Sequence, residues 1–243
     1  MYYTMNNILY ILLILIICIF VIYFFIISRL KRDKFYNKSI YPMLNTVNNY
    51  DIINEVKNNL NNNWMDWPET HLYQDFKING NWKIIPFFGF NTWCHSNCNQ
   101  FPQITQFLQS IKNLKIALLS KIGPKMKLNP HYGWGEHSNH VLRCHYGIIL
   151  PTNYYESYIA VEENDKIEIQ YHQLDDWIIF DDSKLHYAVN SSDTDRIILI
   201  VDLERPSNVK KGMSSSQDTK ELLEVINEIN KSNEEYLLIQ HNS

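Results

Sequence analysis

The chain has 243 residues, a formal net charge of −4, 45% hydrophobic and 14% aromatic residues, and four cysteines. This length allows one folded domain plus appendages, and the hydrophobic content excludes wholesale disorder. The near-neutral balance excludes a general nucleic-acid-binding protein, which needs a clustered cationic surplus, and four cysteines are too few for a disulfide scaffold.

An uncharged apolar run, Ile8 to Ile27, predicts a single membrane-spanning helix near the N-terminus. Twenty residues at about 1.5 Å rise cover the roughly 30 Å hydrocarbon core. A cleaved signal peptide is the alternative, but its apolar part is shorter and follows a basic segment, and no Lys or Arg precedes this run. Basic residues follow the run within Arg29–Lys34, which predicts that the rest of the chain faces the cytosol. Residues 1–34 are therefore expected to form an anchor with its basic flank.

Residues 35–79 are polar and rich in Asn, which predicts a juxtamembrane linker with one helix near Ile52–Leu60. From residue 80 to residue 206 the texture changes to short β-rich runs separated by turn-forming residues, with one helix expected at Ile104–Leu114. Such strands at regular spacing predict an antiparallel sandwich or barrel. The runs are WKIIPFFGF, IALLSKI, HVLRCHYGIIL, SYIAV, KIEIQY, WIIFDD, LHYAV and RIILIVDL.

The tail, residues 207–243, predicts a Ser-rich hinge followed by a short amphipathic helix. Asp218 and Glu221 have the spacing of a capping box, and Leu222 and Ile229 are placed on one face of the helix. A helix that packs on the β domain is favoured over one that binds a partner.

Reactive side chains concentrate between Ser120 and Arg196. His131 lies between a proline and two glycines, which suits a tight loop that exposes an imidazole to a cavity. Strand alternation places Arg143 and His145 on one face of an apolar strand, where a buried arginine needs an anionic partner that a bound carboxylate would supply.

The segment WIIFDDSKLHYAV places Asp182 and His186 between two apolar strands, and Arg196 opens the next strand ten residues later. Arg196 also needs an anion there. Two histidines and anion-seeking arginines inside an all-β frame indicate a mononuclear metal and a dicarboxylate cosubstrate. Imidazole ligands with open positions suit Fe(II).

The stretch PHYG…NHVLRCHYGIILP…WIIFDDSKLHYAVN…RIILIVDLERP resembles the aspartyl/asparaginyl β-hydroxylase family over roughly residues 80–206. The motifs PHxG, LRxHxG, FDDSxxH and a later Arg are weak singly and specific in combination. The resemblance implies a double-stranded β-helix, a cupin-like jelly roll with flanking helices. It also implies a dioxygenase that uses Fe(II), 2-oxoglutarate and O₂.

Carried over residue by residue, the resemblance implies that His131 and His186 bind the iron. The family lacks a metal-ligating carboxylate, and Gly133 occupies the corresponding position here. Asp182 matches a carboxylate that holds the water at the vacant coordination position; a turn residue that caps the FDDS loop is the alternative.

The resemblance further implies that Ser120, Arg143, His145 and Arg196 contact 2-oxoglutarate. Two carboxylates need donors at both ends, which arginine forks and a hydroxyl provide. For Ser120, a buried serine bonded to the backbone is the alternative.

Two weaker patterns lie outside these motifs. Glu136 offers a carboxylate near the metal, but its offset from His131 argues against ligation. Cys94, His95 and Cys98 form a C-H-x-x-C cluster that lacks the further ligand that zinc needs, so ordinary loop residues are favoured.

Three functions are carried forward. Hydroxylation of the β-carbon of Asp or Asn in a protein substrate comes first, because animal relatives of the family do this. Hydroxylation of a membrane-lipid acyl chain is the alternative, which a membrane anchor at Ile8–Ile27 would suit. A non-catalytic jelly-roll membrane protein is the third, and the presence of the ligand histidines and Arg196 argues against it.

Overall fold

A computed structural model describes residues 12–24, 32–61, 64–72 and 82–217, and several positions between 219 and 230. The chain divides into two compact units, Met1–Arg32 with Pro206–Lys211 and Asp33–Arg205 with Gly212–Ser243. In the first unit, residues 12–24 form a helix. No helix within the described residues is both long and apolar enough to cross a membrane. Residues 8–11 and 25–27 of the predicted span lie outside the described part, so the span stays a prediction.

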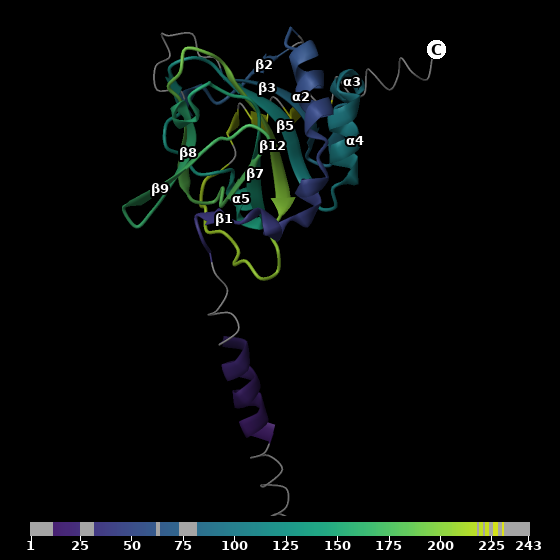
Figure 1. The fold of residues 1–243 in the computed structure, drawn as a ribbon. Coiled ribbons are helices and arrows are strands. Elements are labelled where there is room, and N and C mark those ends of the chain that lie inside the picture. Colours follow the sequence, from purple (N-terminus) through teal and green to yellow (C-terminus); the bar gives the residue numbers. More distant parts are fainter. Residues whose placement is uncertain are drawn as a thin grey trace, which may run out of the picture. The chain divides into compact units, whose positions relative to one another are not determined.

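The second unit contains two antiparallel sheets that face each other (Figure 1). The larger sheet has the order β1-β10-β7-β12-β5-β3-β2, with β4 paired only to β3, and the smaller has the order β6-β11-β8-β9. The larger sheet consists of β1 (Phe35–Tyr36), β2 (Met65–Asp66), β3 (Trp82–Gly89), β4 (Thr92–Trp93), β5 (Leu114–Ile122), β7 (Val141–Ile149), β10 (Trp177–Phe180) and β12 (Arg196–Glu204). The smaller consists of β6 (Met126–Lys127), β8 (Ser157–Glu163), β9 (Lys166–Tyr171) and β11 (Leu185–Asn190).

From β5 to β12 the chain passes repeatedly from one sheet to the other. β5, β7, β10 and β12 belong to the larger sheet, and β6, β8, β9 and β11 to the smaller. This is the strand distribution of an eight-stranded double-sheet jelly roll. The expected all-β core is therefore confirmed.

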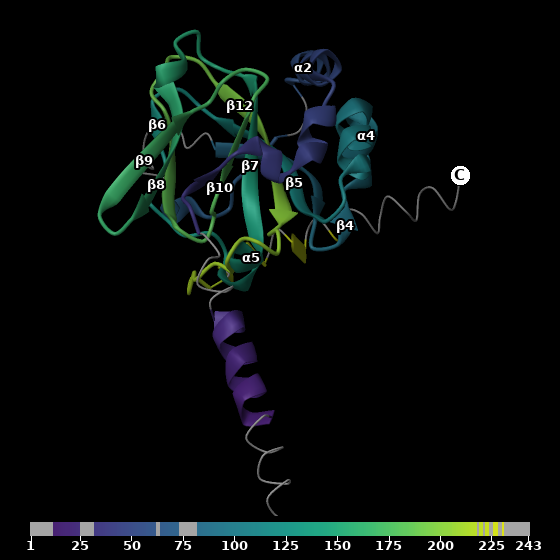
Figure 2. The same cartoon turned by 60° about the horizontal axis from the view of Figure 1, so that its bottom comes forward.

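Two of the helices, α2 (Asn49–Asn58) and α4 (Pro102–Ser110), lie beside the outer face of the larger sheet, while the smaller sheet lies against its inner face (Figures 1 and 2). The α-helices are α2 (Asn49–Asn58), α3 (His95–Gln100), α4 (Pro102–Ser110) and α5 (Gly135–His140). The short 3₁₀ helices are η1 (Lys38–Ile40), η2 (Pro42–Thr46), η3 (Thr70–Leu72) and η4 (Tyr154–Glu156). Because β12 is covered on both faces, all of its residues but the last are buried, which explains its continuous apolar run.

Part of the segment predicted as a linker belongs to this unit. β1 pairs with β10 at the edge of the larger sheet, β2 pairs with β3, and Trp67 packs in the core between the sheets. The predicted helix near Ile52–Leu60 appears as α2. The helix expected at Ile104–Leu114 ends at Ser110, because the backbone becomes extended at Ile111 before β5 begins.

The C-terminal segment returns to the core of the second unit. Residues 220, 222, 223, 226, 227 and 230 are helical, and Leu222 is 3% exposed. Leu222 and Ile226 pack against the core cluster between the sheets, as expected for a helix that covers the domain. Asp218, Glu221 and Ile229 lie outside the described residues.

Candidate functional site

Two imidazoles face each other where the loop after β6 meets β11. His131 and His186 form an isolated antiparallel bridge in which each backbone N–H donates to the other's carbonyl at 2.9 Å. Their ring centroids are 4.4 Å apart. The bridge therefore holds both side chains at one place although 55 positions separate them in the sequence.

Backbone carbonyls determine the orientation of both rings. Nδ1 of His131 lies 2.8 Å from the carbonyl of Asn129, and Nδ1 of His186 lies 2.8 Å from the carbonyl of Lys184. A carbonyl only accepts, so each Nδ1 carries the proton and each Nε2 retains a lone pair, the form that ligates a metal. Burial lowers the pKa of His131 to about 3, with a contribution from His186, and lowers the pKa of His186 to about 4. Both rings are therefore neutral at pH 7.

Asp182 lies beside this pair. Its Oδ1 is 3.4 Å from Nε2 of His186 and 2.8 Å from Nη1 of Arg143, yet neither carboxylate oxygen has a hydrogen-bond partner among the described residues. Burial raises the pKa of Asp182, while Arg143 acts to lower it. The turn-capping role falls to Asp181, whose carboxylate accepts from the backbone N–H and the hydroxyl of Ser183.

A glycine permits the loop of His131 to approach Asp182. The N–H of Gly133 donates to the carbonyl of Asp182 at 2.8 Å. A Cβ at position 133 would overlap the carboxylate of Asp182. The position two residues after His131 is thus filled, in space, by the side chain of Asp182.

Arg143 has its anionic partner within the protein. Its Nε and Nη2 donate to the two carboxylate oxygens of Asp202, each at 2.8 Å. Burial acts to lower the pKa of Arg143, but Asp182 and Asp202 raise it above its usual value. The anionic partner expected for this arginine is therefore supplied within the protein by Asp202, and a contact with a bound carboxylate stays a prediction. Asp202, an isolated acid in the apolar run RIILIVDL, was the signal for this pair.

Arg196 is in the opposite situation. It is 1% exposed, and its Nε and Nη1 have no hydrogen-bond partner in the described part of the chain. Burial alone lowers its pKa to about 9. An arginine that remains charged in a buried position without a counter-ion indicates a site for an anionic ligand.

Ser120 and His145 are two neutral polar residues near Arg196 that line the same pocket. Trp82 Nε1 donates to the hydroxyl of Ser120 at 3.1 Å, which leaves the hydroxyl hydrogen of Ser120 available. His145 is 4% exposed, and its Nδ1 lies 3.2 Å from Nε2 of His172. His172 has no local sequence signal, since it is a lone histidine in a polar stretch.

All six predicted metal and cosubstrate residues line one pocket between the sheets, hereafter the polar pocket. They are Ser120, His131, Arg143, His145, His186 and Arg196. Within the described residues, no three or more His, Cys, Asp or Glu side chains gather in a way that could hold a metal ion. The imidazoles of His131 and His186, whose Nε2 atoms are not engaged by the backbone carbonyls, are the candidate metal ligands in this pocket.

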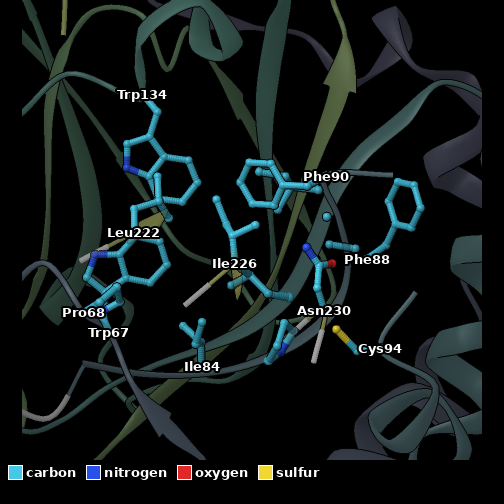
Figure 3. Close-up of a pocket in the computed structure, with 15 residues that line it drawn as sticks. Trp67, Pro68, Ile84, Phe88, Phe90, Cys94, Trp134, Leu222, Ile226 and Asn230 are labelled. Atoms are coloured by element: carbon cyan, nitrogen blue, oxygen red, sulfur yellow. The ribbon is translucent and has the colours of Figure 1, made fainter. Parts of the chain in front are cut away.

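A second, apolar pocket lies on the same face of the larger sheet (Figure 3). Trp67 and Trp134 form one side of it, Phe88 and Phe90 lie opposite, and Ile226 points between them. No charged residue is among the described residues that line it.

Three stacked indoles separate the two pockets. Trp82, which lines the polar pocket, stacks on Trp67 with ring centroids 4.4 Å apart, and Trp67 stacks on Trp134 at 5.3 Å. The buried carboxylate of Glu69 accepts from both Trp67 Nε1 at 3.2 Å and Trp134 Nε1 at 3.0 Å. Its other oxygen accepts from the hydroxyl of Thr219, which ties the C-terminal segment to the stack.

Comparisons with known proteins identify the family to which the chain is similar. The family model described as aspartyl/asparaginyl beta-hydroxylase matches residues 47–206. An ornithine lipid ester-linked acyl 2-hydroxylase from Rhizobium tropici is 33% identical over 131 residues, which cover 51% of this chain and 42% of that protein. The match thus spans less than half the length of this relative.

Solved structures show a general likeness. A prolyl hydroxylase from Trichoplax adhaerens, in complex with a hypoxia inducible factor peptide, has a TM-score of 0.46 and 10% identity, covering 64% of this chain and 77% of its own. A Pseudomonas putida prolyl-4-hydroxylase has a TM-score of 0.44 and 8% identity, covering 65% of this chain and 86% of its own. At these values neither likeness is evidence about activity.

Proposed function

The chain belongs to the aspartyl/asparaginyl β-hydroxylase family, and from this premise we propose that it is an Fe(II)- and 2-oxoglutarate-dependent dioxygenase that hydroxylates a C–H bond. The observation that carries the proposal is the buried guanidinium of Arg196, whose Nε and Nη1 have no hydrogen-bond partner among the described residues and which lines the same pocket as the imidazoles of His131 and His186. A cation of this kind beside two neutral imidazoles suits an anionic cosubstrate next to a metal.

The donor set fits Fe(II). His131 and His186 would hold the ion through Nε2, since both Nδ1 atoms are engaged by backbone carbonyls. The carboxylate of Asp182, which is ion-paired with Arg143 but has no hydrogen-bond donor among the described residues, would accept from a water in the position that a third protein ligand would otherwise take. When bound, Fe(II) with 2-oxoglutarate and O₂ supplies the oxidising chemistry that replaces C–H by C–OH.

The polar side chains that line the pocket of His131 and His186 fit a dicarboxylate. Arg196 would pair with one carboxylate, and Ser120 and His145 would donate to the cosubstrate as neutral groups. Arg143 lines the pocket but already binds Asp202 and Asp182, so we assign it mainly the task of holding Asp182 next to His186. Its contact with the cosubstrate stays a prediction.

The apolar pocket favours an acyl chain as the substrate. A hydroxylated Asp or Asn side chain needs polar partners, and the described lining of the pocket holds no charge and a single amide, Asn230. The name of the Rhizobium tropici relative describes a hydroxylase of a lipid acyl chain, which supports the same choice of substrate. A β-hydroxylated Asp or Asn in a protein is the second candidate, supported by the family description.

The test is succinate release by the full chain supplied with Fe(II), 2-oxoglutarate and O₂. Lipid extracts and Asp/Asn-containing peptides are offered in separate arms, and mass spectrometry detects the added oxygen. His186→Ala should abolish release, whereas the matched control His140→Ala, which removes an exposed histidine bonded to Glu136, should not. Release that is unaffected by His186→Ala would refute the metal site. A protein that binds neither Fe(II) nor 2-oxoglutarate would instead support a non-catalytic jelly roll.

A further inference from the structure

A chain of three buried polar side chains runs from the smaller sheet to the polar pocket. We propose that Ser157 and His172 are positioning residues that hold His145 as a hydrogen-bond donor toward the pocket, for the carboxylate of the bound cosubstrate. This inference rests on the proposed function, because the acceptor it serves is that carboxylate.

The geometry places the three groups in sequence. Ser157, the first residue of β8, has its hydroxyl 3.0 Å from Nδ1 of His172. Nε2 of His172 lies 3.2 Å from Nδ1 of His145 on β7, and the two rings are nearly parallel, at 18°. Ser157 is 0% exposed and His172 1% exposed, so water does not compete for these bonds. The backbone N–H of His172 also donates to the carbonyl of Ser157 at 2.9 Å, which fixes their separation.

The two imidazoles are neutral in this arrangement. Burial lowers the pKa of both well below the usual value, and the positive charge of Arg196 acts in the same direction on each. A neutral imidazole has one N–H donor and one acceptor nitrogen. The hydrogen bonds that link Ser157, His172 and His145 can therefore have only two directions. Either every ring donates toward the pocket, or every ring donates away from it.

Ser157 selects between the two directions. Its hydroxyl has no hydrogen-bond partner except His172 among the described residues. If His172 donated to Ser157, the buried hydroxyl hydrogen would have no acceptor, which carries a free-energy cost. If Ser157 donates to Nδ1 of His172, then His172 donates from Nε2 to Nδ1 of His145. The proton of His145 is then on Nε2, the nitrogen left for the pocket that this residue lines.

The direction matters because a carboxylate only accepts. With the proton on Nε2, His145 donates to a carboxylate next to Arg196. With the chain reversed, the lone pair of Nε2 would face that carboxylate and repel it. A hydroxyl on the other sheet thus controls the ligand preference of a residue in the pocket.

The first test is ¹⁵N NMR of the full chain with labelled histidine, without metal or cosubstrate. We expect both His145 and His172 in the Nε2–H form in the unaltered protein. Ser157→Ala should remove the directional bias, so that a second form of His145 appears. A single Nδ1–H form of His145 in the unaltered protein would overturn the inference. This readout does not depend on the identity of the ligand.

The second test is calorimetric binding of 2-oxoglutarate to the Mn(II)-loaded protein, in which no turnover occurs. We expect His172→Leu to raise the Kd about tenfold and Ser157→Ala to raise it about threefold, the effect of one lost hydrogen bond to a charged group and of a weakened one. His172→Gln keeps an N–H near the position of Nε2 and should recover most of the affinity. The matched control Thr105→Val removes a partly buried hydroxyl hydrogen bond on α4 and should leave the Kd unchanged.

The outcomes separate this inference from the proposed function. Failure of the unaltered protein to bind 2-oxoglutarate would overturn the proposed function and the role of His145 together. Unaltered affinity in folded Ser157→Ala and His172→Leu, with tight binding by the parent, would overturn only the inference. If His172→Leu does not fold, the affinity of Ser157→Ala and the NMR form of His145 in that variant still decide.

Discussion

Arg143 and Asp202 are register partners on the neighbouring strands β7 and β12, and they form a two-pronged ion pair with both N–O distances at 2.8 Å. Arg196 lies on the same strand as Asp202 but has no partner for Nε or Nη1 among the described residues. Two arginines in similar apolar runs are therefore in opposite electrostatic states. Arg143 is neutralised by Asp202, whereas Nε and Nη1 of Arg196 have no hydrogen-bond partner among the described residues.

The two arginines should respond oppositely to removal of their charge. Arg196→Met is expected to leave the unfolding free energy of the ligand-free protein unchanged or to raise it by about 1–3 kcal/mol, because an unpaired buried charge is removed. Arg143→Met should lower it by about 3–5 kcal/mol, because Asp182 and Asp202 would be left without a cation. Urea unfolding measures both. Similar losses in the two variants would contradict the assignment of Arg196 as the uncompensated charge.

The close approach of Gly133 to Asp182 makes this glycine irreplaceable. A Cβ at position 133 would overlap the carboxylate and come within 2.8 Å of the backbone carbonyl of Asp182. We expect Gly133→Ala to lower the unfolding free energy by about 1–3 kcal/mol and to weaken Fe(II) binding measured by calorimetry. Gly89→Ala is the control, since its nearest contact would be 4.0 Å from Ile116. Equal behaviour of the two variants would disprove the crowding.

Stability of the metal-free protein should fall as the pH is lowered from 7 to 5. His131 and His186 have folded pKa values of about 3 and about 4, below the usual 6.5. The unfolded chain therefore binds more protons over this interval, and stability is present above pH 6.5 and lost as pH falls toward the folded values. Each histidine should contribute about 2 kcal/mol.

Urea unfolding at the two pH values measures this loss. His186→Phe should reduce it, and Asp182→Asn should increase it, since the raised pKa of Asp182 acts in the opposite direction. A pH-independent unfolding free energy would show that the imidazoles are exposed rather than buried.

Filling the apolar pocket should block an acyl substrate without damage to the polar pocket. Ile226→Trp places an indole between Trp67 and Phe88, and we expect a more than roughly tenfold lower rate of lipid hydroxylation by mass spectrometry, since the variant leaves less room for the chain. Binding of 2-oxoglutarate should not change. Leu223→Trp is the matched control, because Leu223 is 48% exposed. Retained lipid hydroxylation in Ile226→Trp would place the chain elsewhere.

Local patterns in the sequence were sufficient for several features. Strand alternation and turn residues identified the runs that become β3, β5, β7 and β12, and the motif residues His131 and His186 do meet. The polar composition of residues 35–79 gave no indication that Trp67 is part of the core. Its burial depends on stacking against Trp82 and Trp134. Such a contact between distant segments leaves no periodic trace.

By itself, the sequence determined the all-β class, which follows from local side-chain order, and its motifs supplied the candidate residues for metal and anion binding. Only the tertiary structure decided which of those residues are already satisfied. Strand register pairs Arg143 with Asp202 and leaves Arg196 alone, and the meeting of the two sheets brings His172 to His145. The physical reason is that neutralisation and hydrogen bonding are settled by neighbours in space, here 59 and 27 residues apart along the chain.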